Sequence, residues 1–148
     1  MSTVNVNAKI FPETVKSGIV ILDWWASWCG PCKAFAPIYE ASSAAHPDIV
    51  FGKINTEHER ELSTVFGIRS IPTLMVFREG ILLSAQPGML DAEGIADLLN
   101  HARGLDMDAV RRQIADAEKM KAPGIRRSSE ALAKMSVNEG TVDRAALG

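Results

Sequence analysis

The chain has 148 residues, of which 47% are hydrophobic and 23% charged, and its formal net charge at pH 7 is −2. These values are typical of one globular domain with a short extension, and the small net charge does not indicate a nucleic-acid or membrane-surface partner. The longest strongly apolar stretch, GIVILDWWASW, contains Asp23 and is too short to span a bilayer. The N-terminus lacks the basic flank and apolar run of a secretory signal, so a cytoplasmic location is expected.

The first half of the chain alternates between strand and helix patterns. Residues 4–16 predict a short edge strand followed by a first helix. Residues 19–26 are almost continuously apolar and rich in β-branched side chains, which predicts a buried central strand. Apolar residues at helical spacing over 32–46 predict a helix that bends at Pro37, and residues 49–55 predict a second strand.

The second half adds two helices and a hairpin. Residues 57–67 predict a helix that ends at Gly67. Residues 73–85 contain two strand patterns around an Arg-Glu-Gly turn, which predicts a hairpin. Residues 90–104 predict a closing helix with Asp91 as its N-cap. The order of the elements predicts an α/β fold with a central mixed sheet, mostly parallel with an antiparallel C-terminal hairpin, flanked by helices.

The composition changes after this closing helix. All nine aromatic residues lie between positions 11 and 77, and residues 105–148 contain no aromatic residue and no cysteine. We therefore predict a compact domain over residues 1–104 and a helical, partly disordered C-terminal extension over residues 105–148. Within the extension, residues 106–121 predict one helix, and residues 128–137 predict a further turn or two.

The stretch WASWCGPCKAFAP holds the only two cysteines of the chain, Cys29 and Cys32. A strand precedes them and a helix follows, so Cys29 is expected at a helix N-terminus, where unpaired N–H groups and the helix dipole favour the thiolate. Cys32 is expected on the same face but deeper in the helix. This asymmetry predicts that Cys29 attacks a disulfide in another molecule and that Cys32 then attacks Cys29 to release the reduced partner. Gly30 and Pro31 are expected to shape the tight entry into the helix.

A close cysteine pair has two other uses, metal binding and a purely structural disulfide. A metal site usually needs four ligands, whereas this chain has two cysteines, and the nearest histidine, His46, is expected at the far end of the helix. A structural disulfide is disfavoured in a reducing cytosol. The spacing therefore favours a reactive pair, and neither a bound metal nor a cofactor is expected.

Three segments extend the pattern beyond the cysteines: VILDWWASWCGPCKAFAPIYE (20–40), FGKINTE (51–57) and FGIRSIPTLMVFREG (66–80). In order and spacing they resemble the thioredoxin family, and the resemblance covers about residues 4–103. It implies the thioredoxin fold, reduction of disulfides in protein substrates, and recharging by a thioredoxin reductase with NADPH. The Gly-Pro dipeptide between the cysteines resembles the reducing branch of the family. A monomer is expected.

The resemblance also implies roles for two charged residues. A carboxylate within an apolar strand is expected to have a raised pKa, and Asp23 matches the family's buried acid, which assists removal of the proton from Cys32. The alternative is an acid tolerated at the edge of the strand. Lys53 matches the family's lysine near that acid, and the alternative is a surface lysine whose stem packs on apolar groups.

Further matches lie in the loops expected around the cysteines. Most X–Pro bonds in folded proteins are trans, but Pro72 matches the family's cis-proline, which would leave the backbone of Ile71 free to pair with an extended substrate. Gly88 matches the glycine of a neighbouring loop that leaves room for the substrate. Trp28 is expected to form a flat apolar rim beside Cys29, with ordinary core packing as the alternative.

Residues 105–148 exceed what a minimal member of the family requires. One alternative function is therefore a redox-gated adaptor, in which this extension holds a partner and the cysteines regulate the contact. Another is a reductant dedicated to one enzyme or sensor.

Overall fold

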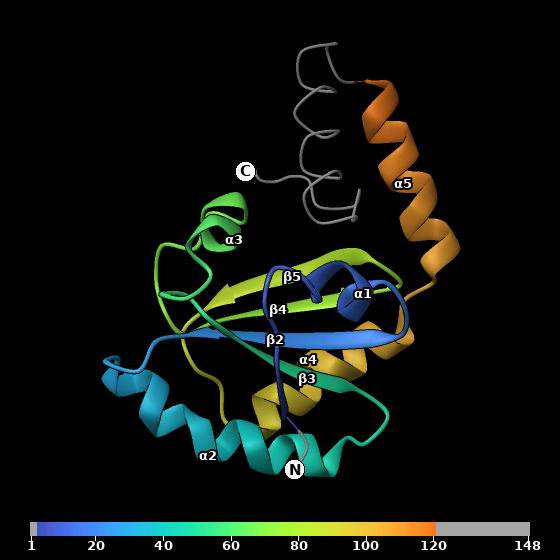
Figure 1. Cartoon of the computed structure of the whole chain (residues 1–148). Coiled ribbons are helices and arrows are strands. Elements are labelled where there is room, and N and C mark those ends of the chain that lie inside the picture. Colours follow the sequence, from blue (N-terminus) through green and yellow to red (C-terminus); the bar gives the residue numbers. More distant parts are fainter. Residues whose placement is uncertain (1–2, 121–148) are drawn as a thin grey trace.

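The computed structural model of the chain describes residues 3–120 (Figure 1). The short helix predicted at residues 128–137 lies outside this range. Within it, the elements follow one another as β1 (Thr3–Asn5), α1 (Phe11–Val15), β2 (Ile19–Trp25), α2 (Gly30–Ala45), β3 (Val50–Asn55), α3 (Arg60–Val65), β4 (Thr73–Arg78), β5 (Ile81–Pro87), α4 (Ala92–Gly104) and α5 (Met107–Lys119).

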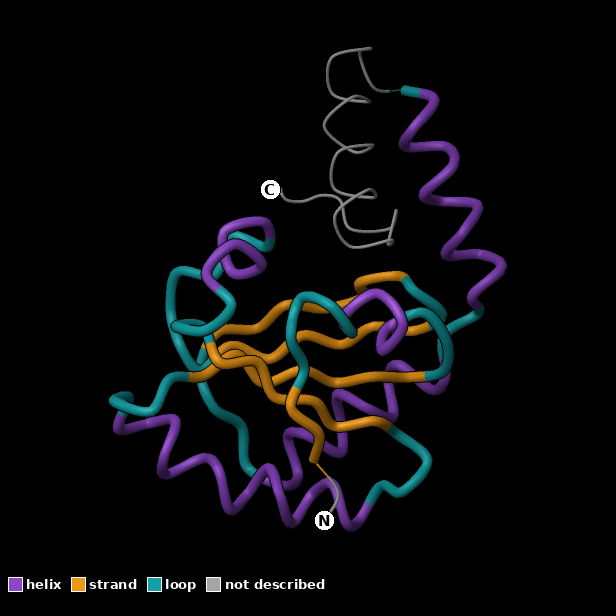
Figure 2. Tube along the Cα trace, viewed as in Figure 1, coloured by secondary structure: helices purple, strands orange, loops and turns teal. Residues whose placement is uncertain are grey.

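In the described part of the chain the strands form one mixed sheet in the order β1-β3-β2-β4-β5, with β2 at its centre (Figure 2). β3 pairs in parallel with both β1 and β2, whereas β4 pairs antiparallel with both β2 and β5. The predicted α/β fold and its C-terminal hairpin are confirmed. The register places Asp23 of β2 opposite Lys53 of β3 on one side and opposite Leu74 of β4 on the other.

Helices cover both faces of the sheet, because the central strand is apolar on both sides. Leu22 of β2 packs in a core cluster with Phe11 of α1 and Leu62 of α3. Its neighbour Ile21 points to the opposite face and packs in a second cluster with Tyr39 of α2 and buried residues of α4. The sheet therefore lies between α1 and α3 on one face and α2 and α4 on the other (Figure 1).

Capping groups fix where two of these helices begin. α2 begins at Gly30, directly after its N-cap Cys29, and continues through Pro37. α4 begins after Asp91, whose side chain accepts the backbone N–H of Gly94 at 2.8 Å, so the predicted N-cap is confirmed.

Turn chemistry decides the other boundaries. α3 is shorter than the predicted helix of residues 57–67, because the side chain of Asn55 accepts the backbone N–H groups of Glu57 and the residue after it and holds the chain in a turn. The hairpin between β4 and β5 turns at Glu79 and Gly80, whose φ angles are 54° and 81°. Positive φ at both positions matches the twist of the flanking strands.

The helix predicted at residues 106–121 is α5. Asp106 is its N-cap and accepts the backbone N–H groups of the second and third residues that follow it. Met107, its first residue, is buried. The helix leaves the domain at the end of the sheet where the β4–β5 hairpin turns (Figure 1).

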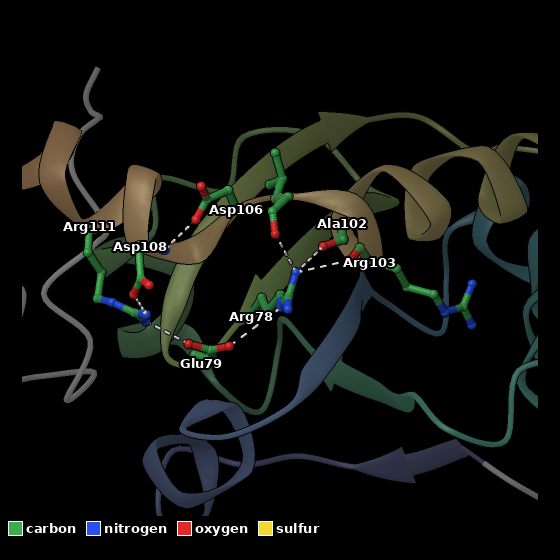
Figure 3. Close-up of polar contacts among 8 residues, drawn as sticks. Arg78, Glu79, Ala102, Arg103, Asp106, Asp108 and Arg111 are labelled. Carbon is green, nitrogen blue, oxygen red and sulfur yellow. Dashed lines mark hydrogen bonds and ion pairs between the residues drawn. The ribbon is translucent and has the colours of Figure 1, made fainter.

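A network of charged side chains connects this end of the sheet to α5 (Figure 3). Arg78 is the last residue of β4, and its Nε lies 3.6 Å from Glu79. Glu79 in turn pairs with Arg111 of α5 at 2.6 Å. Arg78 also donates from Nη1 to three backbone carbonyl oxygens at and beyond the end of α4: Ala102 at 2.8 Å, Arg103 at 3.3 Å and Leu105 at 3.1 Å.

Candidate active site

Cys29 and Cys32 lie at the start of α2 and are joined by a disulfide. Their Cα atoms are 5.2 Å apart, and both residues are buried. Cys29 is the N-cap, and its sulfur accepts the backbone N–H of Cys32 at 3.2 Å. The predicted position at a helix N-terminus is confirmed. The free N–H groups and the positive end of the helix dipole face the Cys29 sulfur, and both stabilise a thiolate there once the disulfide is reduced.

A backbone segment before β4 lies against the disulfide. The peptide bond between Ile71 and Pro72 is cis, as the resemblance implied. The carbonyl oxygen of Ile71 is 3.8 Å from the Cys29 sulfur, and the Ile71 side chain packs on the cluster formed by Ala26 and the two cysteines. The N–H of Gly88 donates to the carbonyl oxygen of Pro72 at 2.8 Å. This bond joins the loop after β5 to the segment that touches the disulfide.

Trp28, the residue before Cys29, is 64% exposed. Its indole Nε1 donates to the carboxylate of Glu57 in the turn after β3. The exposure excludes the alternative of ordinary core packing, and an open aromatic ring beside a disulfide suits contact with a polypeptide. Sequence reasoning missed Glu57. The available signal was its place two residues after β3, whose carboxyl end lies beside that of β2.

Asp23 lies in the middle of the central strand and is 1% exposed, which excludes an acid at the strand edge. Burial raises its pKa from 3.8 to about 7, and the positive charge of Lys53 opposes part of that rise. The Oδ1 atom of Asp23 has no hydrogen-bond partner among the described residues. A carboxyl group with this pKa is able both to take up and to release a proton near neutral pH.

Lys53 is half-buried, and its Nζ lies 4.9 Å from the centroid of the Trp25 ring. Because alternate residues of a strand face opposite sides, Asp23 and Trp25 face the same side as Ile21, and Lys53 lies opposite Asp23 on that side. This is the face covered by α2. The charged pair therefore lies beneath the helix that carries Cys32.

Gly30 and Pro31 are the first two residues of α2, and both are exposed. At this position the missing N–H of proline removes no helical hydrogen bond. Together with Ile71, which touches the Cys29 sulfur, they lie next to the disulfide at the carboxyl end of β2, and the loop of Gly88 is bonded to the residue after Ile71. The structure thus brings the predicted site residues to one end of the sheet, and the two charged residues lie in the strands that lead to it.

The reactive groups at this end of the sheet are two sulfurs and one buried carboxyl. Across residues 3–120, no three or more His, Cys, Asp or Glu side chains are grouped so that they could hold a metal ion. Over the same part of the chain, none of the helices combines the length and apolar character needed to cross a membrane.

Two thiols that close into a disulfide beside an exposed surface can pass two electrons to a disulfide in another molecule, so fold and site together define a thiol–disulfide oxidoreductase. The family model described as Thioredoxin matches residues 2–101. The chain belongs to the thioredoxin family. Thiol–disulfide exchange through Cys29 and Cys32 is its chemistry.

Individual relatives agree with this assignment. A Streptomyces coelicolor protein assigned as a thioredoxin is 48% identical over 118 residues, which cover 79% of this chain and 88% of that protein. The thioredoxin of Bacillus subtilis is 33% identical over 101 residues, 68% of this chain and 97% of that one. A solved structure of a thioredoxin variant from Halobacterium salinarum has a TM-score of 0.64 and 26% identity, and the match covers 71% of this chain and 94% of that one. The 118 residues matched by the Streptomyces protein reach beyond residue 104.

Proposed function

We propose that this protein reduces disulfide bonds in other proteins. The position of the Cys29 sulfur carries the proposal, because it lies at the N-terminus of α2 beside the carbonyl oxygen of Ile71 and the exposed ring of Trp28. An extended substrate segment can pair with the Ile71 backbone while its side chains contact Trp28, which brings its disulfide to Cys29. The remaining proposed substrate contacts are Gly30, Pro31, Pro72 and Gly88.

The reaction consists of two exchanges. The Cys29 thiolate attacks one sulfur of the substrate disulfide, forms a mixed disulfide and releases the other substrate sulfur as a thiolate, which takes up a proton. Cys32 then loses its proton, attacks the Cys29 sulfur and releases the second substrate sulfur, which is also protonated. Starting from the dithiol, the protein gives up two electrons and two protons. It ends with the Cys29–Cys32 disulfide of the structure.

Asp23 is the proposed acceptor of the Cys32 proton. Its pKa of about 7 means that carboxylate and carboxylic acid are both present near neutral pH. The carboxylate takes the proton during the second exchange, and the acid returns a proton when the disulfide is reduced again. Lys53 lowers the pKa of Asp23 and thereby increases the share of the carboxylate that is ready to act.

A protein that ends each cycle oxidised needs a source of electrons. Membership of the family supports thioredoxin reductase with NADPH as that source, and disulfide-containing proteins as the substrates. The proposed location is the cytoplasm, and the proposed working form is a monomer without a bound cofactor.

Reduction of insulin disulfides in the presence of thioredoxin reductase and NADPH tests this function. The native protein is compared with Cys29→Ser and Cys32→Ser. Cys29→Ser is expected to be inactive, because it lacks the attacking sulfur. Cys32→Ser is expected to accumulate covalent mixed disulfides, visible on a non-reducing gel. Equal loss of activity in both variants without a trapped species would contradict the assigned order of attack.

A second candidate function is the adaptor whose contact involves residues 105–148. Two observations favour it: the Arg78–Glu79–Arg111 network fixes the start of α5 on the domain, and the Streptomyces match reaches beyond residue 104. Deletion of residues 105–148 separates the two functions. The reductase function predicts unchanged insulin reduction and an unchanged set of mixed disulfides. The adaptor function predicts unchanged reduction together with loss of a complex that the full chain forms in only one redox state.

A further inference from the structure

Tyr39 is the only tyrosine of the chain. It is fully buried, with its ring centroid 5.5 Å from that of Phe35 and 5.1 Å from that of Phe51. Its hydroxyl oxygen lies 3.0 Å from the carbonyl oxygen of Ile21 and 2.7 Å from that of Gly52. A tyrosine hydroxyl has one proton to donate, so the two carbonyls share it in a three-centre hydrogen bond.

The two carbonyl groups lie next to the buried charged pair. Ile21 is two residues before Asp23 in β2, and Gly52 is one residue before Lys53 in β3. Asp23 and Lys53 are opposite each other in the parallel register of these strands. The hydroxyl of Tyr39 therefore contacts both strands immediately before the point where they carry the acid and the lysine.

The same side chain belongs to the helix that carries the second cysteine. Tyr39 follows Cys32 by seven residues, about two helical turns, so both lie on one face of α2. Apolar contacts such as those of Phe35 hold α2 against the sheet but are not directional. A hydrogen bond acts only over a narrow range of distance and angle, so it fixes where the helix lies on the strands.

The surroundings of the hydroxyl favour its protonated form. Burial raises the pKa of Tyr39 well above its ordinary range, and the negative charge of Asp23 raises it further. The hydroxyl is therefore available as a donor to the two carbonyls, and Tyr39 and Asp23 are close enough to influence each other electrostatically.

We propose that Tyr39 is a positioning residue for the second exchange: its hydroxyl holds α2 on β2 and β3 so that the Cys32 thiol meets the Asp23 carboxyl. The proposal rests on the role proposed above for Asp23. It predicts that loss of the hydroxyl slows the attack by Cys32 while the earlier attack by Cys29, at the helix N-terminus, is unaffected.

Reaction of the reduced protein with dithiobis(nitrobenzoate), an aromatic disulfide, resolves the two steps. Attack by Cys29 releases the first nitrothiobenzoate, and attack by Cys32 on the mixed disulfide releases the second. In Tyr39→Phe the first phase is expected within about twofold of the native rate, and the second slowed about tenfold, the scale of a small misplacement of reacting groups. The pH profile of the second phase is expected to change as well, because proton transfer to Asp23 becomes less effective.

Phe35→Leu is the matched control, because it removes buried packing from the same face of α2 without changing a hydrogen bond. Its second phase is expected within about twofold of the native rate. Equal slowing in Phe35→Leu, or a native second phase in Tyr39→Phe, would overturn the proposal. A native protein that shows no second phase would instead contradict the proposed function, so the two failures are distinguishable.

A second measurement does not depend on the folding of a variant. Fluorotyrosine incorporated throughout the chain labels Tyr39 alone, and its fluorine NMR signal reports on that site. The signal is expected to move with a midpoint at about pH 7 as Asp23 titrates, and to lose this movement in Asp23→Asn. A signal that does not respond to pH across this range would overturn the link between Tyr39 and Asp23.

Discussion

The two ends of strand β4 differ in the kind of group that makes their contacts. The segment before its first residue touches the disulfide through Ile71. The hydrogen bonds and close polar contacts there come from backbone groups and sulfur: the N-cap of α2, the carbonyl oxygen of Ile71 and the N–H of Gly88. Arg78 ends the strand, and there long charged side chains connect α4, the hairpin and α5 (Figure 3).

Substitutions at the two ends of β4 should therefore differ in their effect on the redox chemistry. The strand β4 has six residues, so about 20 Å separate its ends. Substitutions at the Arg78 end should change stability and leave disulfide reduction intact. Substitutions in the buried strands beneath Cys32 should change both stability and chemistry.

The largest expected change in stability comes from Asp23→Asn. Because burial raises the pKa of Asp23 from 3.8 to about 7, the folded protein binds more protons than the unfolded chain between these values, and its stability falls as the pH rises through this range. The neutral variant lacks this loss. The difference in the free energy of unfolding between oxidised Asp23→Asn and native protein should grow by about 4 kcal/mol from about pH 4 to about pH 8 in urea titrations.

Asp48→Asn is the control of opposite sign. The hydrogen bond from Arg103 holds the pKa of exposed Asp48 below its ordinary value. That contribution to stability is present above the unfolded pKa and is lost as the pH falls through the folded one. The free energy of unfolding of Asp48→Asn should therefore lie below that of the native protein at neutral pH, and the two values should become equal in acid. If the difference in the free energy of unfolding between Asp23→Asn and the native protein were the same in acid and at neutral pH, this result would contradict the burial of a titrating Asp23.

The next largest effect is expected from Arg78→Met at the other end of the strand. The variant keeps the apolar stem but loses the charged donor to three carbonyl oxygens of α4 and its following residues. We expect a loss of about 2 kcal/mol in the free energy of unfolding, typical of hydrogen bonds from a partly buried charged group. Insulin reduction at a temperature where the variant is folded should stay within about twofold of the native rate.

Arg112→Met controls for the general loss of an arginine, because Arg112 is an exposed residue of α5. It should change the free energy of unfolding by less than about 0.5 kcal/mol. Slower reduction by a fully folded Arg78→Met variant would mean that the two ends of β4 are not independent.

The smallest effect is expected from Glu79→Gln, which breaks the ion pair with Arg111. The two side chains are 40% and 49% exposed, so the pair should contribute about 0.5 kcal/mol or less. Salt at about 1 M should remove the difference in urea titrations, because exposed charges are screened. A loss that equals that of Arg78→Met, or that persists in high salt, would show that the pair is more important to α5 than its exposure indicates.

Local sequence patterns were sufficient to predict much of the structure around the two cysteines. The apolar run of residues 19–26 forms β2, and the cysteines after it lie at the start of a helix. Both features depend on neighbours in the sequence. The cis bond before Pro72 followed from the resemblance, because a single X–Pro pair does not determine its isomer.

Contacts between distant segments account for what the sequence did not reveal. Tyr39 is one of the residues whose helical spacing over 32–46 predicted a helix, but periodicity cannot show that its hydroxyl reaches the carbonyl groups of two strands. Arg78 donates to backbone groups 24 to 27 residues away. The hairpin pattern of residues 73–85 does not reveal these contacts, because an arginine at the end of a strand is equally compatible with a side chain that points into solvent. α3 begins late because the side chain of Asn55 holds a turn, which helix propensity alone does not capture.

Alkylation of the reduced protein with iodoacetamide across a range of pH, with the modified residues identified by mass spectrometry, shows whether Cys29 is held as a reactive thiolate. A thiolate held at the N-terminus of α2 predicts that Cys29 reacts first, with half-maximal rate at a pH well below the ordinary thiol pKa of about 8.5, while Cys32 is protected. Equal and slow reaction of both cysteines, with the pH dependence of thiols in an unfolded peptide, would contradict it.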